Sequence, residues 1–179
     1  MKHVLLTALA AGALLTGVTM ADAHGPTRQK VTETIEINAP AAKVWSVIGN
    51  FQDMSWHPAV AKQEGKGGND VNATRTLTLQ GGPVIPEETL EKYDGPGMNY
   101  SYRITKEDVK VLPVTNYTSR IAVTEEGGKS KVEWRGAFYR GFPNNDPPPE
   151  LSDEAAIKAI TGVYKSGLEA LKKKVESGS

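Results

Sequence analysis

The residues from Ser152 to Val175 constrain the fold of this chain more than any other stretch. Apolar side chains recur there at steps of three and four residues, which is the spacing of one face of an α-helix. Ser152 is a favourable N-cap, and the acidic start and lysine-rich end of the stretch match the helix dipole. A helix of about six turns cannot bury its own stripe, so the preceding chain must supply a complementary apolar surface. The stripe consists of Ile157, Ile160, Tyr164, Leu168, Leu171 and Val175.

The first 23 residues have the pattern of a secretory signal peptide. Lys2 precedes an apolar run from Val4 to Val18, and Ala21-Asp22-Ala23 forms a small-x-small cleavage site. The alternative is a membrane anchor, but this run is shorter than the roughly 20 apolar residues that a bilayer requires. We therefore expect export to the periplasm and cleavage near Ala23. Residues 24–179 would then form a single domain with no membrane span.

The composition limits the chemistry that this domain can perform. The chain has 21 basic and 21 acidic residues and no cysteine. The charge balance gives no electrostatic reason to expect nucleic acid as a partner. The lack of cysteine excludes disulfides, thiolate catalysis and cysteine-ligated metals. After cleavage His24 and His57 would be the only histidines, so we expect neither a metal site nor a cofactor.

The chain between residues 30 and 140 reads mainly as strands and turns. Asn38-Ala39-Pro40 starts a short helix that ends near Gly49, and a second helical turn is predicted over Phe51–Trp56. The proline-rich residues 141–150 can form only a crossing loop. The alternating segments predict strands over Lys30–Ile37, Val60–Gly65, Val71–Leu79, Val84–Tyr93, Met98–Lys106, Val114–Thr124 and Lys131–Arg140.

This order of elements predicts an α+β domain of two layers. We expect a helix-grip fold, in which a curved antiparallel sheet of about seven strands surrounds the long C-terminal helix, with two short helices after the first strand. The gap between the helix and the sheet can become a cavity.

Alternation along the strands assigns an inner face that is apolar and aromatic with two opposite charges, Arg75 and Glu88. These charges are either polar anchors of a ligand cavity, or they point to the rim or simply pair across two strands. His57, in the turn Trp56-His57-Pro58, either lines the cavity mouth or simply shapes the turn. We name as candidate ligand-binding residues Trp56, His57, Arg75, Glu88, Tyr100, Tyr102, Tyr117, Trp134, Phe138 and Tyr164.

Several motifs together resemble the START-like (SRPBCC) superfamily of polyketide cyclases, Bet v 1 relatives and lipid-binding domains. Within it, the chain most resembles the MxaD-type accessory proteins of methylotrophic bacteria. That resemblance implies a periplasmic role beside methanol dehydrogenase and its cytochrome c electron acceptor. The motifs are Ala39-Pro40-Ala41-Ala42-Lys43-Val44-Trp45, Trp56-His57-Pro58, Glu88-x-Leu90, Tyr102-Arg103-Ile104, Trp134-Arg135-Gly136-x-Phe138 and Gly162-x-Tyr164-x-x-Gly167-Leu168-x-x-Leu171-Lys172.

Three functions follow as hypotheses. The first is a non-enzymatic periplasmic accessory protein of methanol oxidation, acting through surface loops. The second is a carrier whose inner cavity holds a hydrophobic small molecule such as a lipid, quinone or aromatic. The third is a cyclase or dehydratase, in which Glu88 or His57 is the general base and Arg75 holds an enolate oxygen. The enzyme ranks last because the sequence offers no paired carboxylates and no nucleophile.

Overall fold

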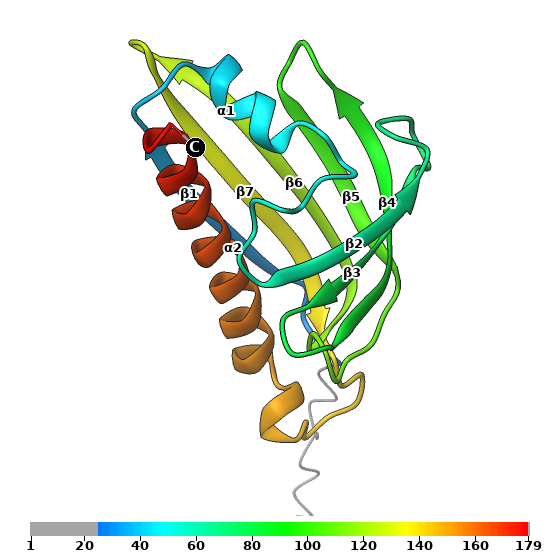
Figure 1. Ribbon diagram of the computed structural model, residues 1–179. Coiled ribbons are helices and arrows are strands. Elements are labelled where there is room, and N and C mark those ends of the chain that lie inside the picture. Colours follow the sequence, from blue (N-terminus) through cyan, green and yellow to red (C-terminus); the bar gives the residue numbers. More distant parts are fainter. Residues whose placement is uncertain (1–24, 179) are drawn as a thin grey trace, which may run out of the picture.

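Seven antiparallel strands form a single curved sheet, and the long helix α2 packs mainly on β1 and β7 (Figure 1). The computed structural model describes residues 25–178, so the predicted signal peptide lies outside the described residues. The strand order is β1-β7-β6-β5-β4-β3-β2. The strands are β1 (Gln29–Ile37), β2 (Val60–Lys66), β3 (Thr74–Leu79), β4 (Val84–Asp94), β5 (Asn99–Lys106), β6 (Val114–Glu126) and β7 (Lys129–Arg140). The helices are α1 (Ala41–Ile48), the short 3₁₀ helix η1 (Pro149–Leu151) and α2 (Asp153–Glu176).

Helix α2 forms as the sequence pattern predicts. The Ser152 hydroxyl caps it by accepting a hydrogen bond of 3.2 Å from the Ala155 N–H. Its apolar stripe is buried against the sheet from Ile160 to Val175. Ile157 differs from the prediction because its side chain is 38% exposed. No helix within residues 25–178 is long and apolar enough to cross a bilayer.

The second short helix predicted over Phe51–Trp56 does not form. The Ser55 N–H, which in a helix would donate to the Phe51 carbonyl, donates instead to Asp53 Oδ1 at 2.9 Å, and the Phe51 carbonyl accepts from Arg75 Nη1. Such side-chain bonds compete with the i→i−4 bonds of a helix. The segment is therefore a series of turns, and one short helix, α1, follows β1 in the described chain.

The strand predicted over Val71–Leu79 begins three residues later, at Thr74. Asn72 adopts a positive φ of 73°, outside the β region that regular strand pairing requires, and Val71 is 57% exposed. The preceding residues form a turn instead. The other predicted strands occur close to their expected bounds, and hairpins connect consecutive strands from β2 to β7.

Candidate functional site

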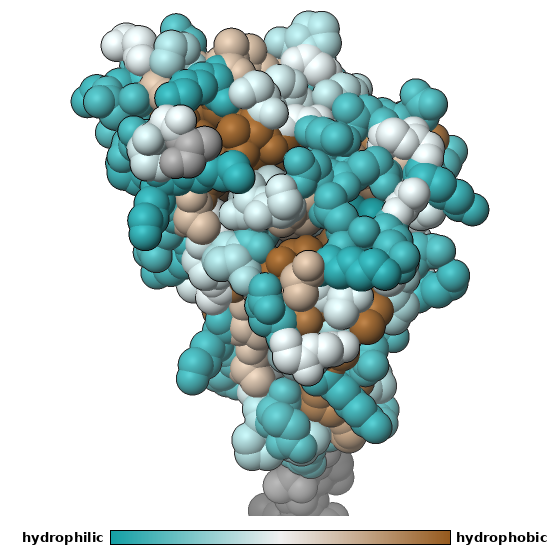
Figure 2. All heavy atoms as spheres, viewed as in Figure 1, coloured by the Kyte–Doolittle hydropathy of each residue, from teal (hydrophilic) through white to brown (hydrophobic). Residues whose placement is uncertain are grey.

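A cavity of about 60 Å³ lies between α2 and the inner face of the sheet. Helix α2, the segment before β2 and the strands β2 to β7 contribute to its wall, which is mostly apolar. Figure 2 shows hydrophobic residues reaching the surface between α2 and the strands β2 and β3, among hydrophilic neighbours. The lining residues are Met54, His57, Ala59, Val60, Leu77, Leu79, Ile85, Glu88, Tyr102, Ile104, Leu112, Tyr117, Trp134, Ile160 and Val163.

The size of this cavity is small for a ligand site. Pockets for drug-sized molecules usually measure about 300–1,000 Å³, whereas one water takes about 30 Å³ in the liquid. The side chains on the inner face therefore fill most of the space between helix and sheet. A larger molecule can enter only if part of the wall moves outward.

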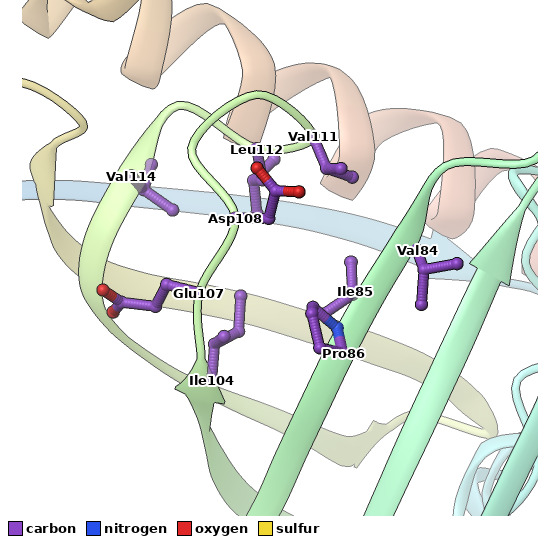
Figure 3. A pocket seen from close by; sticks show the side chains of 9 residues that line it. All are labelled: Val84, Ile85, Pro86, Ile104, Glu107, Asp108, Val111, Leu112 and Val114. Carbon is purple, nitrogen blue, oxygen red and sulfur yellow. The ribbon is translucent and has the colours of Figure 1, made fainter.

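A smaller hollow of about 10 Å³ adjoins the cavity where the loop between β5 and β6 covers it (Figure 3). It shares Ile85, Ile104 and Leu112 with the cavity wall. Asp108 braces the loop, since its carbonyl accepts from the N–H groups of Val111 and Leu112, both at 3.0 Å. Residues 107–113 belong to no strand, and the Gly141 N–H ties the end of this loop by donating to the Pro113 carbonyl at 2.9 Å.

Arg75 and Glu88 form a buried ion pair at the edge of the cavity. They are direct neighbours across β3 and β4, and Arg75 Nε lies 2.6 Å from Glu88 Oε2. Arg75 Nη1 also donates to the Phe51 carbonyl at 2.6 Å, whereas Nη2 has no hydrogen-bond partner among the described residues. Burial acts to lower the pKa of Arg75, but the adjacent Glu88 carboxylate outweighs it and raises that pKa. The two charges therefore pair across β3 and β4 and do not point to the rim.

The aromatic rings of Phe51 and Tyr102 cover the guanidinium. Arg75 Cζ lies 4.2 Å from the Phe51 ring centroid and 5.0 Å from that of Tyr102. Cation–π attraction of this kind is worth most where water is excluded. Arg75 is therefore held from several sides at once, although it does not line the cavity.

A chain of hydrogen bonds ties α2 to the sheet at the opposite wall. The hydroxyls of Tyr117 and Tyr164 lie 2.7 Å apart, and the Tyr164 hydroxyl lies 3.0 Å from Ser119 Oγ. Ser119 Oγ also accepts from Trp134 Nε1 at 2.9 Å and donates to the Arg135 carbonyl at 3.0 Å. Burial raises the pKa of both tyrosine hydroxyls, so they stay protonated. Every polar atom in this chain has a partner, as a buried network requires.

His57 is held in one orientation by bonds to both ring nitrogens. Its Nδ1 accepts from the Ala59 N–H at 3.1 Å, so Nε2 carries the proton and donates to the Val163 carbonyl at 3.0 Å. Burial lowers the pKa of His57, the bond to Val163 raises it, and the nearby Arg75 charge lowers it; the net effect is downward. His57 is thus a neutral link between the segment before β2 and α2.

Only half of the ten predicted site residues line the cavity in the structure. Five line the cavity: His57, Glu88, Tyr102, Tyr117 and Trp134. The other five are buried behind its wall: Trp56, Arg75, Tyr100, Phe138 and Tyr164. Alternation alone places Leu77, Leu79 and Ile104 on the inner face, but no sequence pattern could reveal Leu112, which reaches the wall from a loop.

These arrangements offer little for acid–base chemistry. Glu88 is engaged by Arg75, and both nitrogens of His57 are occupied by backbone groups. Within residues 25–178 no group of three or more His, Cys, Asp or Glu side chains is placed to hold a metal ion. The wall is suited to holding an apolar molecule more than to transforming one.

Residues 28–176 match the family described as polyketide cyclase/dehydrase and lipid transport. The chain belongs to this family. The match confirms the START-like resemblance at the level of the superfamily. No protein of curated function matches the chain.

Two solved structures of proteins from Bacillus species resemble the chain over most of its length. An uncharacterised protein from Bacillus thuringiensis is 33% identical with a TM-score of 0.68, covering 82% of this chain and 98% of its own. XoxI from Bacillus cereus is also 33% identical, with a TM-score of 0.69 and coverages of 82% and 94%.

A plant enzyme shows how widely this fold is used. Norcoclaurine synthase from Thalictrum flavum, solved with dopamine and hydroxybenzaldehyde, has a TM-score of 0.64 and is 17% identical over 100% of this chain and 99% of its own. At that identity the likeness concerns the fold alone. It confirms the seven-stranded sheet with a long C-terminal helix that the sequence predicts.

Proposed function

We propose that this protein carries a hydrophobic small molecule between α2 and the inner face of the sheet. The observation that supports this function best is the cavity itself, which lies where the two layers separate and has an almost wholly apolar wall. The family description, which includes lipid transport, agrees with it. A lipid, quinone or aromatic molecule fits the chemistry of such a wall.

Uptake requires the cavity to open, and the loop over residues 107–113 is the element that opens it. Leu112 belongs to both the cavity and the adjoining hollow, so moving this loop joins the two spaces. The Arg75–Glu88 pair and the Tyr117–Tyr164 contact stay in place, because several bonds hold each of them.

The narrower role implied by the sequence resemblance stays a prediction. Neither the family description nor the names of these relatives mention methanol dehydrogenase or a cytochrome c. The periplasmic location is likewise a prediction, which depends on residues 1–23. N-terminal sequencing tests it directly, because cleavage after Ala23 would give a mature protein that begins at His24.

Native mass spectrometry of the protein isolated gently from its own cells separates these roles. The carrier function predicts an additional mass of small-molecule size that is lost on denaturation. A bare protein that also fails to bind apolar probes contradicts the carrier function. A complex with a dehydrogenase or cytochrome subunit would instead support the accessory role.

A matched pair of variants on α2 tests whether the ligand occupies this cavity. Val163 lines the cavity, whereas Ile157 lies two turns earlier and is exposed. We expect Val163→Phe to lower the affinity for a fluorescent apolar probe at least tenfold, because the larger side chain fills the space. Ile157→Phe should leave the affinity unchanged. Equal affinities in both variants, each with a wild-type circular dichroism spectrum, would place the ligand elsewhere.

A further inference from the structure

The outer face of the sheet, turned away from α2, carries an open hollow of about 680 Å³. It extends over β1, β4, β5, β6 and β7, so the whole sheet separates it from the inner cavity. Four basic side chains and one acidic side chain line it. The lining residues are Lys30, Thr32, Glu91, Lys92, Asn99, Ser101, Thr118, Ser119, Arg120, Arg135, Gly136 and Ala137.

The strand register places most of these charges in one row. Lys92 of β4 is paired with Ser101, Ser101 with Arg120, Arg120 with Arg135, and Arg135 with Thr32 of β1. Arg120 and Arg135 are thus direct neighbours on adjacent strands, about 4.8 Å apart in the sheet. Like charges placed directly opposite each other destabilise a sheet.

The acidic side chains nearby leave most of this charge uncompensated. Glu91 is bound to Arg103 at 2.8 Å, and Glu133 lies 3.8 Å from Arg135 Nε. Arg120 Nε donates to the neutral Asn99 amide at 3.3 Å. Among the described residues, no acidic side chain lies within ion-pair distance of Lys30, Lys92 or Arg120.

Small side chains explain why the face is hollow at this point. In the row next to the two arginines, Lys30 is paired with Ala137, and Ala137 with Thr118. Gly136 presents only its backbone to this side, because a Cβ there would point to Tyr164 on the inner face, and the Thr118 hydroxyl accepts a bond of 3.2 Å from Arg28. The centre of the hollow is therefore formed by short side chains, some of which carry hydroxyl groups, and longer lysine and arginine side chains surround it.

We propose that this hollow binds a small polyanion, with a carboxylate or phosphate group held between the guanidinium groups of Arg120 and Arg135. Guanidinium forks match the oxygen geometry of both groups, and two forks on neighbouring strands can reach one oxyanion. Lys30 and Lys92 are placed to bind a second anionic group at either side. The volume falls in the usual range of small-molecule sites. This site is independent of the hydrophobic carrier function.

Titration of the full mature chain with pyrophosphate and, separately, with citrate tests the site and distinguishes the two oxyanion groups. The titration is followed by NMR of the backbone amides at low ionic strength. We expect saturable chemical-shift changes in β6 and β7 with at least one of the two probes. Arg120→Gln and Arg135→Gln should each weaken binding at least tenfold. Lys158→Gln, on the exposed surface of α2, is the matched control and should bind as the wild type does.

The melting temperature distinguishes a binding role from a structural one. If the two arginines serve to bind an anion, replacing either one removes the repulsion between their charges. Tm at low ionic strength should then stay the same or rise, while anion binding is lost. A lowered Tm in both variants would mean that the arginines support the sheet and would overturn the proposal. Absence of saturable binding by both probes, or equal loss in Lys158→Gln, would overturn it as well.

Discussion

A buried guanidinium needs a counter-charge, and β4 places Glu88 directly opposite Arg75 to supply it. Arg75 is 1% exposed and Glu88 is 4% exposed, so each charge depends on the other for most of its stabilisation. Breaking such a pair leaves one uncompensated charge in the core, whereas replacing both charges removes the need for compensation. The contribution of each of these two residues to stability therefore depends on the presence of the other.

Glu88→Gln tests this dependence. We expect it to lower the free energy of unfolding by about 3–5 kcal/mol, because Arg75 would remain charged and buried without a carboxylate. The double variant Arg75→Met with Glu88→Leu should recover most of that loss. Urea unfolding of the three proteins measures both effects. A double variant as unstable as the single one would show that the hydrogen bond from Arg75 to the Phe51 carbonyl matters more than the pair.

At the scale of elements, α2 meets the rest of the protein through a close approach at a glycine. A Cβ at Gly167 would lie 2.5 Å from His57 Cδ2 and 2.9 Å from Trp134 Cζ3. Gly136 on β7 plays the same role from the sheet, because a Cβ there would overlap the Tyr164 hydroxyl. These glycines leave room for the rings of His57, Trp134 and Tyr164 between helix and sheet.

Two alanine substitutions on α2 separate this packing from helix propensity. Gly167→Ala should destabilise the protein by about 1–3 kcal/mol, because the added methyl group overlaps two buried rings. Gly162 lies on the exposed side with no atom near its missing Cβ, so Gly162→Ala should stabilise by roughly 0.5–1 kcal/mol. Thermal unfolding measures both. The same sign of change in the two variants would contradict the close-approach explanation.

At the scale of the whole molecule, His57 links global stability to pH. The folded protein holds this histidine neutral, with a pKa below its ordinary value of 6.5. Below about pH 6.5 the unfolded chain binds a proton at this position, and the folded protein does so only at lower pH. The contribution of His57 to the free energy of unfolding is therefore complete above about pH 6.5 and is lost as the pH falls below that value.

Urea unfolding between about pH 7.5 and pH 5 measures this dependence. The contribution of one such group cannot exceed about 1.4 kcal/mol per pH unit. We expect His57→Gln to show a shallower decrease than the wild type. Parallel stability curves for the two proteins would mean that His57 keeps the same pKa in both states.

The sequence alone supported much of the fold but only part of the site. The helical stripe from Ile160 to Val175 and the alternation of seven strands depend on local periodicity, and both features formed as expected. The helix expected over Phe51–Trp56 did not form, because the Phe51 carbonyl accepts from the buried Arg75, distant in sequence, and the Ser55 N–H donates to Asp53 Oδ1.

Alternation along a strand determined which face of the sheet each side chain occupies, since a strand reverses its side chains at every residue. It therefore placed Arg75 and Glu88 on one face without showing their register. Only the tertiary structure decided that they are opposite each other, that the space beside them measures about 60 Å³, and that Arg120 and Arg135 meet on the other face. Register and packing depend on contacts between segments far apart in the chain, and a local pattern carries no information about such contacts.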